Sequence, residues 1–236
     1  MTIAILKPRF EEVVAVTTIN LPDFGLEFNA QRVGPTNFYG LRTADYGPGF
    51  RMPTMPELVP LVYASPKNRD KETAKNVIRS LKENWLTGNT AIHYFPEGMF
   101  VEDNPEMKNG RIVTPTQKDL EKRLGSHEEI GIAFSHDKSV RFVPDGFKRE
   151  SQTALELARN PGIIALTGSE ENAEMLAKAS EHYKLDPWFY TLSKVDLPQT
   201  RVAGLGSSNF GNRLVVGAGN SEDYDYGGSF GVKNTW

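Results

Sequence analysis

The segment RVAGLGSSNFGNRLVVGAGN (residues 201–220), followed by GGSFGVK (residues 227–233), carries the clearest structural signal in this chain. Short runs of small and β-branched residues predict three strands, at residues 200–206, 212–219 and 228–233, with glycine-rich turns between them. Gly, Ser, Asn, Asp and Tyr make up 20 of the 36 residues from Arg201 to Trp236. These residue types are typical of antibody binding loops, where Tyr supplies rigid contact area and Ser, Asn and Gly supply adaptable hydrogen bonds. We therefore expect binding loops mounted on a sheet; a hairpin without a partner, or a frayed terminus, stays the alternative.

The composition of the whole chain is that of a globular protein. It has 236 residues, of which 39% are hydrophobic and 24% charged, enough for one large domain or two small ones. A net charge of -3 provides no basic surface for nucleic acid or anionic lipid. The absence of cysteine excludes disulfides, thiolate nucleophiles and cysteine-type zinc sites. The apolar run at residues 3–6 ends at Lys7-Pro8, so we expect no secretory leader, no membrane span and, by default, a cytoplasmic protein.

Apolar periodicity and capping residues predict the helices. Thr54 and Glu57 form a capping box at the start of a helix that Pro60 shortens or kinks. An apolar stripe predicts an amphipathic helix over residues 70–88, running through Trp85. Further helices are predicted at residues 116–125, 151–160 and 169–184, the last two capped by Ser151 and Ser169.

Short runs of apolar and β-branched residues elsewhere in the chain predict additional strands, and the order of the elements predicts the domain organisation. Strands are expected at residues 11–19, 90–95, 111–113, 131–135, 139–143 and 162–167. Strands and helices alternate irregularly, and no linker divides the chain. We therefore predict a single α+β domain over residues 1–236, with an inserted subdomain at about residues 66–150.

Motifs for catalysis and metal binding are incomplete. The nucleophile elbow G-x-S-x-G fails at Phe210, and the dinucleotide fingerprint G-x-G-x-x-G fails at Glu222. Glu222, Asp223 and Asp225 carry oxygen ligands of the kind that Ca²⁺ prefers, but they lack regular ligand spacing, which favours a solvated acidic loop. The histidines also lack metal-site spacing; they are His93, His127, His136 and His182. We expect no enzyme activity, cofactor or metal, and keep an enzyme that uses Tyr, Asp and His near the tail as an alternative.

Two segments in the right order resemble C-type-lectin-like domains of the formylglycine-generating-enzyme type. The first is GFRMPTMPEL (residues 49–58), which is similar to the WRLPT-x-x-EL signature that opens the first helix of related bacterial domains. The second is the C-terminal segment, with Arg201-Val202, Arg213-Leu214-Val215 and Phe230-Gly231-Val232 in the positions of three recurrent strands. The cysteines of the enzymes and the calcium motifs of vertebrate lectins are missing, so neither activity is implied.

The resemblance extends best to the variable proteins of diversity-generating retroelements, in a prokaryotic/archaeal form. In those proteins the last segment is rewritten at adenines, which scatters Asn codons into Asn, Ser, Asp, Tyr, Gly and Phe. The resemblance implies a C-type lectin fold with small mixed or antiparallel sheets flanked by two main helices. It also implies that residues 201–236 form a hypervariable surface for an unknown protein or cell-surface ligand. The implied contact residues are Ser207, Ser208, Asn209, Phe210, Asn212, Asn220, Ser221, Asp223, Tyr224, Asp225 and Tyr226.

Three structural expectations follow from this interpretation. The strand at residues 11–19 should lie near the C-terminal strand. Phe210, Tyr224 and Tyr226 should be exposed and close together, with glycines 217, 219, 227 and 228 allowing the loops to turn. A lectin-like adhesin or surface-assembly subunit of fixed specificity is the alternative function.

Overall fold

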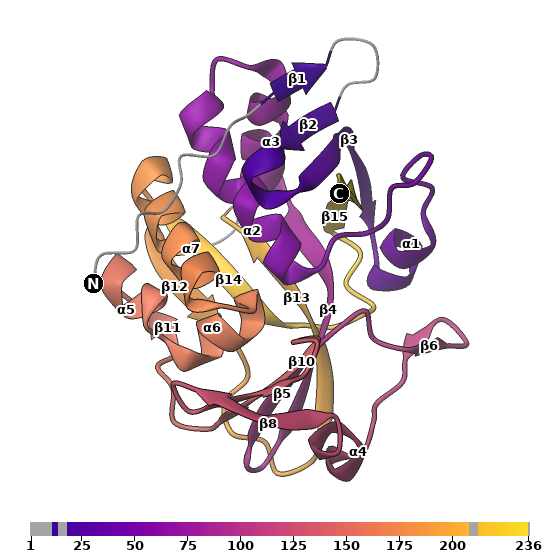
Figure 1. The fold of residues 1–236 in the computed structure, drawn as a ribbon, viewed down its shortest axis with the longest axis vertical. Coiled ribbons are helices and arrows are strands. Elements are labelled where there is room, and N and C mark those ends of the chain that lie inside the picture. The colour runs from indigo at the N-terminus through magenta and orange to yellow at the C-terminus, as the bar shows by residue number, and fades with distance from the viewer. Residues whose placement is uncertain (1–10, 14–17, 208–211, 236) are drawn as a thin grey trace.

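The computed structural model describes residues 11–13, 18–207 and 212–235, which form a large twisted sheet with helices packed against it (Figure 1). The strands are β1 (Glu11–Val13), β2 (Thr18–Leu21), β3 (Leu26–Thr36), β4 (Trp85–Phe95), β5 (Gly98–Asp103), β6 (Met107–Lys108), β7 (Arg111–Ile112), β8 (Leu124–Glu129), β9 (Ile132–Ser135), β10 (Val140–Pro144), β11 (Glu150–Ser151), β12 (Asp186–Tyr190), β13 (Gln199–Gly206), β14 (Arg213–Asn220) and β15 (Gly227–Asn234). The helices are α1 (Phe38–Thr43), α2 (Met55–Ala64), α3 (Glu72–Glu83), α4 (Gln117–Glu121), α5 (Ala154–Ala158), α6 (Pro161–Thr167) and α7 (Glu170–Tyr183), with 3₁₀ turns at Pro22–Phe24 and Ser65–Asn68.

The main sheet contains 13 strands in the described part of the chain, so it is larger than the small sheets expected from the sequence. Its longest path runs β1-β2-β3-β15-β4-β13-β14-β12-β11. The sheet forks at β4, because the beginning of β4 pairs with β15 and its later part pairs with β5. From β5 a second branch continues through β10 and β9 to β8. Residues 66–150 thus contribute both to the centre of the sheet and to this branch, and the inserted subdomain stays a prediction.

One face of the sheet is covered by α2, α3 and α7. The α2 capping box forms as predicted, with the Thr54 and Glu57 side chains each accepting from the other's backbone N–H. Leu58, Leu61 and Leu176 from these helices belong to one apolar core with sheet residues. The described residues contain no helix with the length and apolar character needed to cross a membrane.

The other face of the sheet has two smaller apolar clusters. Phe38 and Leu41 of α1 pack there with Ala91 of β4 and Val202 of β13. Leu120 of α4 packs with aromatic residues of the β4-β5 branch. These short elements cover the far side of the sheet that the long helices leave open.

The structure corrects three predicted elements. The helix at residues 70–88 ends at Glu83, and Trp85 begins β4 instead of extending the helical stripe. Residues 162–167 are helical in α6, which Asn160 caps and a left-handed Gly168 ends. Ser151 lies in β11, and Thr153 caps α5 instead. Pairing of Trp85 with Gly227 of β15 outweighs the helical period at that position. The Asn-Pro start and the Gly end of α6 are helix signals, but the apolar run at residues 162–167 obscured them.

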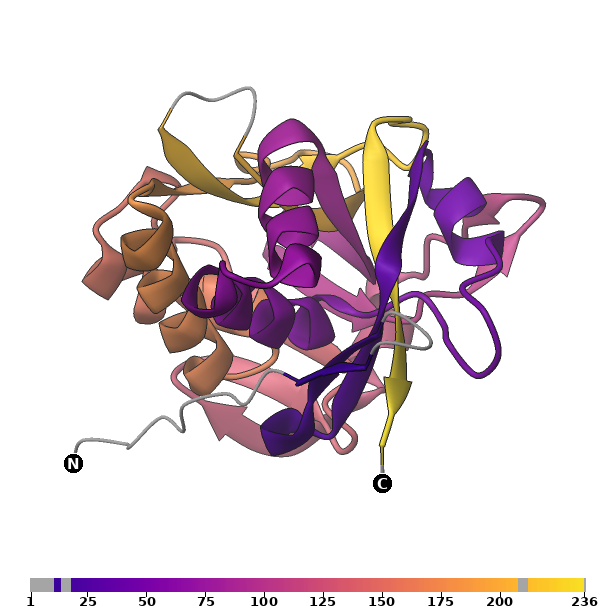
Figure 2. The same ribbon diagram turned by 90° about the horizontal axis from the view of Figure 1, so that it is seen from above.

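The N-terminal strand is also different from the prediction. Residues 11–19 were expected to form one strand, but β1 and β2 are two antiparallel strands, with Glu11 opposite Asn20. β3 was not predicted at all, and it pairs with β2 on one side and β15 on the other. Figure 2 shows β15, in yellow, running beside β3. The N- and C-terminal strands therefore lie near each other, as expected: β3 alone separates β2 from β15, and β2 and β3 separate β1 from β15.

Glycines near the C-terminus serve close packing rather than turning. Gly217 is a strand residue of β14, and a Cβ at this position would lie 2.6 Å from the ring of Trp85. Gly204 and Gly206 of β13 lie against the same ring. Gly219 similarly leaves room for Tyr190. None of the described glycines at 217, 219, 227 and 228 has positive φ, so the expectation that they provide turns was wrong.

The contact between Gly217 and Trp85 gives a first prediction. Gly217→Ala should lower the free energy of unfolding by about 1–3 kcal/mol, because the buried indole has to shift to admit a methyl group. Chemical denaturation of both proteins measures this. The control is a double-mutant cycle with Trp85→Leu, in which the smaller side chain should recover part of the loss. Equal losses in both backgrounds would contradict the proposed contact.

A buried charged cluster joins β4, β5 and the segment after α4. His93 Nε2 donates to Glu102 Oε2 at 3.0 Å, and Arg123 donates to the other oxygen of the same carboxylate. His93 Nδ1 lies 3.0 Å from Thr200 Oγ1 on β13. Burial alone would raise the pKa of Glu102, but the hydrogen bonds from His93 and Arg123 outweigh it and hold the pKa below its usual 4.5. The ionised carboxylate therefore stabilises the folded chain.

The pH dependence of stability should report this cluster. Because the folded-state pKa of Glu102 lies below its unfolded value of 4.5, its stabilisation is present above that pH and is lost as pH falls. Glu102→Gln should cost about 1–3 kcal/mol at pH 7, and the difference from wild type should shrink below pH 4.5. Glu106→Gln, at an exposed position, is the control and should change little. Urea titrations across pH 3 to 7 measure both; a Glu102→Gln difference independent of pH would contradict the role of the carboxylate.

Candidate functional site

The loop at residues 221–226 connects β14 to β15 and is attached to the rest of the protein by Glu222. The Glu222 carboxylate accepts from the Ile112 backbone N–H at 2.8 Å and from Arg111 Nη1 at 3.0 Å. The Glu222 carbonyl also accepts from the Phe38 N–H at 3.1 Å. One residue thus joins the loop to α1 and to the β6-β7 hairpin, which are far from it in sequence.

The other side chains of this loop remain largely accessible. Ser221, Asp223 and Asp225 are exposed, and Tyr226 is 61% exposed. Tyr224 is half-buried, with its ring centroid 5.5 Å from that of Tyr226. This confirms the expected tyrosine pair, whereas Phe210 lies outside the described residues. Exposed aromatic rings in contact on an anchored loop are the kind of group that forms the centre of a binding interface.

Two further tyrosines lie on elements that border this region and were missed by the sequence analysis. Tyr39 of α1 is 48% exposed and follows Phe38, whose N–H binds the Glu222 carbonyl. Tyr190 ends β12, lies opposite Gly217 in the parallel register with β14, and packs against Gly219. The run of three aromatic residues in DPWFY (residues 186–190) is the sequence signal that could have identified Tyr190 as a strand residue.

The other predicted contact residues fall at several places. Asn220 ends β14 and is half-buried, while Asn212 precedes β14 and is exposed. Eight residues of extended chain separate them, so their backbones lie about 25 Å apart. Ser207 is only 5% exposed, because its N–H and hydroxyl both donate to the Leu81 carbonyl at the end of α3; the expectation of an exposed side chain there was wrong. Ser208 and Asn209 lie outside the described residues.

Two acidic residues of the loop, Glu222 and Asp223, form ion pairs with the same arginine. Arg111 Nη1 pairs with Glu222 at 3.0 Å and with Asp223 at 3.3 Å. Within the part of the chain that the structure describes, no group of three or more acidic, histidine or cysteine side chains could hold a metal ion. The loop chemistry is therefore that of polar and aromatic contact.

Comparison with known proteins identifies the fold. No protein-family model and no curated protein sequence matches this chain. A solved structure, described as "Accommodation of massive sequence variation in Nanoarchaeota by the C-type lectin fold", is similar with a TM-score of 0.54 and 19% sequence identity. The likeness covers 86% of this chain and 97% of that chain. The chain therefore has the architecture of a C-type lectin fold.

Proposed function

We propose that this protein is a ligand-binding protein that presents the loop at residues 221–226 to a protein ligand. The observation that carries the proposal is the contrast within this loop. Glu222 is bound by Ile112, Arg111 and Phe38, whereas the residues around it keep their side chains available. Anchoring the backbone while leaving Tyr224 and Tyr226 accessible reduces the entropy that binding costs.

We further propose that the surface is a variable one, diversified by a retroelement in a prokaryotic host. Exposed side chains at 212, 221, 223, 225 and 226 contact little of the core, so substitution there leaves the scaffold intact. The C-type lectin fold of the Nanoarchaeota protein, described as accommodating massive sequence variation, supports this extension. Ser208, Asn209 and Phe210 belong to the proposed set on sequence grounds, and Ser207 is left out because it is buried.

The DNA around the gene tests the diversification. We expect a neighbouring reverse transcriptase gene and a near-copy of the last hundred or so bases of the coding sequence, differing mainly at adenines. Substitutions between related copies should fall at the exposed positions and spare Glu222. A gene with neither neighbour would contradict diversification and favour a binding protein of fixed specificity.

The anchored loop itself is tested by selection against a defined probe. A library should randomise Ser221, Asp223, Tyr224, Asp225 and Tyr226 and be selected on purified lysozyme. Most members should unfold cooperatively, and selected binders should lose about tenfold in affinity when Glu222→Ala is added, because the loop then has to be ordered on binding. A matched change, Glu106→Ala, should leave affinity unchanged. Members that mostly fail to fold, or binders indifferent to Glu222→Ala, would contradict the proposal.

Tyr226 in the loop and Phe230 in β15 provide a matched test of whether the loop side chains lie at the surface or belong to the core. Tyr226→Ala should change the free energy of unfolding by less than about 0.5 kcal/mol, because the ring is mostly exposed. Phe230→Ala should cost about 3–5 kcal/mol, because that ring is fully buried in β15. Thermal or urea unfolding measures both. Losses of similar size would mean that the loop is part of the core.

A further inference from the structure

The loop at residues 221–226 is too short to form an interface with a protein ligand by itself. A standard interface between two proteins uses about 20–30 residues on each side. The loop has six residues, and one of them, Glu222, is bound by Ile112, Arg111 and Phe38. A protein ligand seated on the loop therefore has to contact the elements beside it as well.

The contacts of the loop identify these neighbouring elements. The Phe38 N–H of α1 donates to the Glu222 carbonyl, and Arg111 of the β6-β7 hairpin donates to the Glu222 carboxylate. The helix and the hairpin also contact each other, because the Tyr39 ring lies against Gly110 in the hairpin turn. A Cβ built on Gly110 would lie 3.8 Å from that ring. The loop, α1 and the hairpin turn therefore form one continuous surface.

Tyr39 is a large exposed side chain on this surface, and its backbone is held firmly. The residue is 48% exposed. It lies in α1, where the Asn37 side chain accepts from the Gly40 N–H and the preceding residue, Phe38, is buried. A tyrosine on a fixed backbone supplies contact area at a low cost in entropy, and tyrosines are enriched among the residues that dominate interfaces. Tyr39 therefore has the chemistry and the mounting of an interface anchor.

We propose that Tyr39 is a fixed part of the binding surface, so that a protein held by the 221–226 loop also packs on the Tyr39 ring. This inference rests on the function proposed for the loop. The loop side chains determine which protein binds, whereas Tyr39 lies outside residues 201–236 and contributes affinity to each variant. The ligand is accordingly a folded protein broad enough to cover the loop and α1 together.

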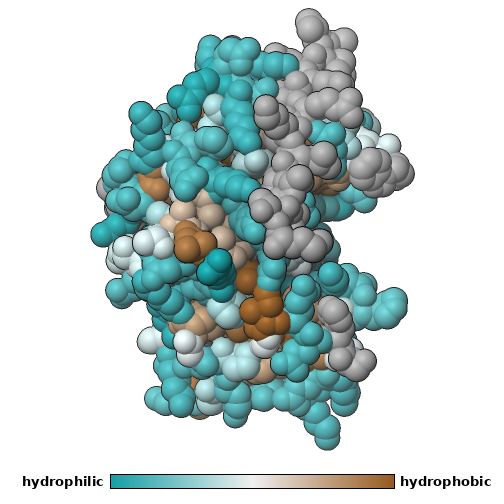
Figure 3. All heavy atoms as spheres, turned by 60° about the vertical axis from the view of Figure 1, so that its left-hand side comes forward, coloured by the Kyte–Doolittle hydropathy of each residue, from teal (hydrophilic) through white to brown (hydrophobic). Residues whose placement is uncertain are grey.

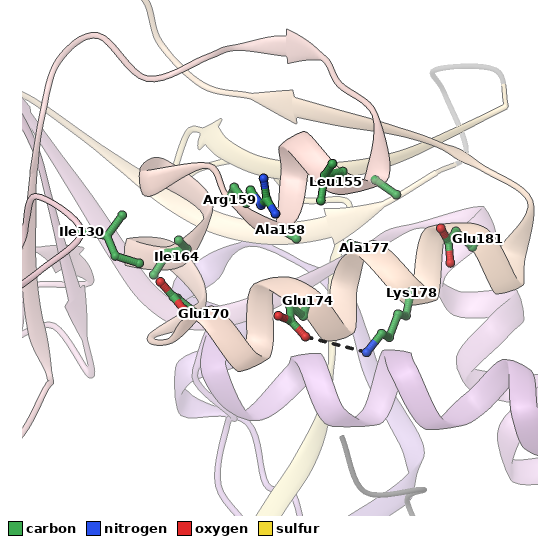
Figure 4. Close-up of a pocket in the computed structure, with 11 residues that line it drawn as sticks. Ile130, Leu155, Ala158, Arg159, Ile164, Glu170, Glu174, Ala177, Lys178 and Glu181 are labelled. Carbon is green, nitrogen blue, oxygen red and sulfur yellow. Dashed lines mark ion pairs between the residues drawn. The ribbon is translucent and has the colours of Figure 1, made fainter. Parts of the chain in front are cut away.

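A groove between α5 and α7 supplies a control surface (Figure 4). The groove encloses about 580 Å³, and Leu155, which lines it, is 60% exposed. Figure 3 shows hydrophobic surface, in brown, gathered on this side of the molecule. Figures 1 and 2 place α5 and α7 on the opposite side of the molecule from α1. A protein bound to the loop and to Tyr39 should therefore leave Leu155 uncovered.

Lysozyme binders selected from a library randomised in the loop test the contribution of Tyr39. In independently selected binders, Tyr39→Ala should weaken lysozyme binding by about tenfold or more, because it removes the contact area of the ring. Tyr39→Phe should keep most of the affinity, since the ring remains. Leu155→Ala is the control and should leave the affinity unchanged. Calorimetric titration of each variant with lysozyme measures the dissociation constants.

A double-mutant cycle with Glu222→Ala separates direct contact from an effect on the anchor of the loop. If the Tyr39 ring contacts lysozyme, the loss of about tenfold should persist in the Glu222→Ala background. A loss that disappears in that background would mean that Tyr39 only positions the loop, and it would overturn the proposal.

Thiol labelling reports the contact directly, because the chain contains no cysteine. Excess lysozyme should slow the reaction of a maleimide with Tyr39→Cys by at least about fivefold and leave the rate at Leu155→Cys unchanged, since thiol reactivity depends on access. Mass spectrometry measures both rates. Binders in which neither affinity nor labelling depends on position 39 would overturn the role of Tyr39 and leave the function of the loop standing. A library without lysozyme binders would instead contradict the function of the loop, and this inference with it.

Discussion

The complete burial of β4 is the constraint on which the rest of the structure depends. All 11 residues of this strand are buried, although they include Thr87, Asn89, Thr90 and His93. The neighbouring strands therefore have to satisfy the backbone groups of β4, and residues of adjoining strands and helices have to satisfy its polar side chains. Thr90 accepts from the Met55 N–H at the start of α2 and donates to Asp103 of β5, which fixes both elements on the strand.

Shielded carboxylates hold parts of this cysteine-free chain together. Glu57 caps α2 and pairs with Arg51, Glu102 holds His93 and Arg123, and Glu222 holds Arg111 and the Ile112 N–H. Each carboxylate is largely shielded from solvent and accepts from an arginine together with a second donor. Such charge-assisted bonds are directional, so they specify where loops sit as well as stabilising them.

At the C-terminal end of the chain, one set of residues holds the backbone in place and another set presents accessible side chains. β14 and β15 contribute Leu214, Val216 and Phe230 to the main core, while the connection between them is held at Glu222. The proposed variation would then fall on flanking side chains that contribute little to the core.

Local chemistry in the sequence determined several features directly. The α2 capping box, the helix beginning at Ser169 and the strands near residues 200, 213 and 228 were predicted because their signals lie within a few adjacent residues. The contact between Tyr224 and Tyr226, with Tyr226 exposed, was predicted because loop composition differs sharply from core composition.

The tertiary structure decided what depends on residues far apart in the chain. Trp85 continues a helical stripe, yet it pairs with Gly227 of β15, and the next residue, Leu86, pairs with Leu205 of β13, so α3 ends at Glu83. Gly217 could have served a turn, but the ring that requires its missing side chain comes from β4, 132 positions earlier. Glu222 could have been one more solvated acid, and only the approach of Ile112 and Arg111 makes it the anchor of the loop. Local periodicity and capping report the preferences of a segment, whereas pairing, close approach and burial are properties of neighbours that only folding brings together.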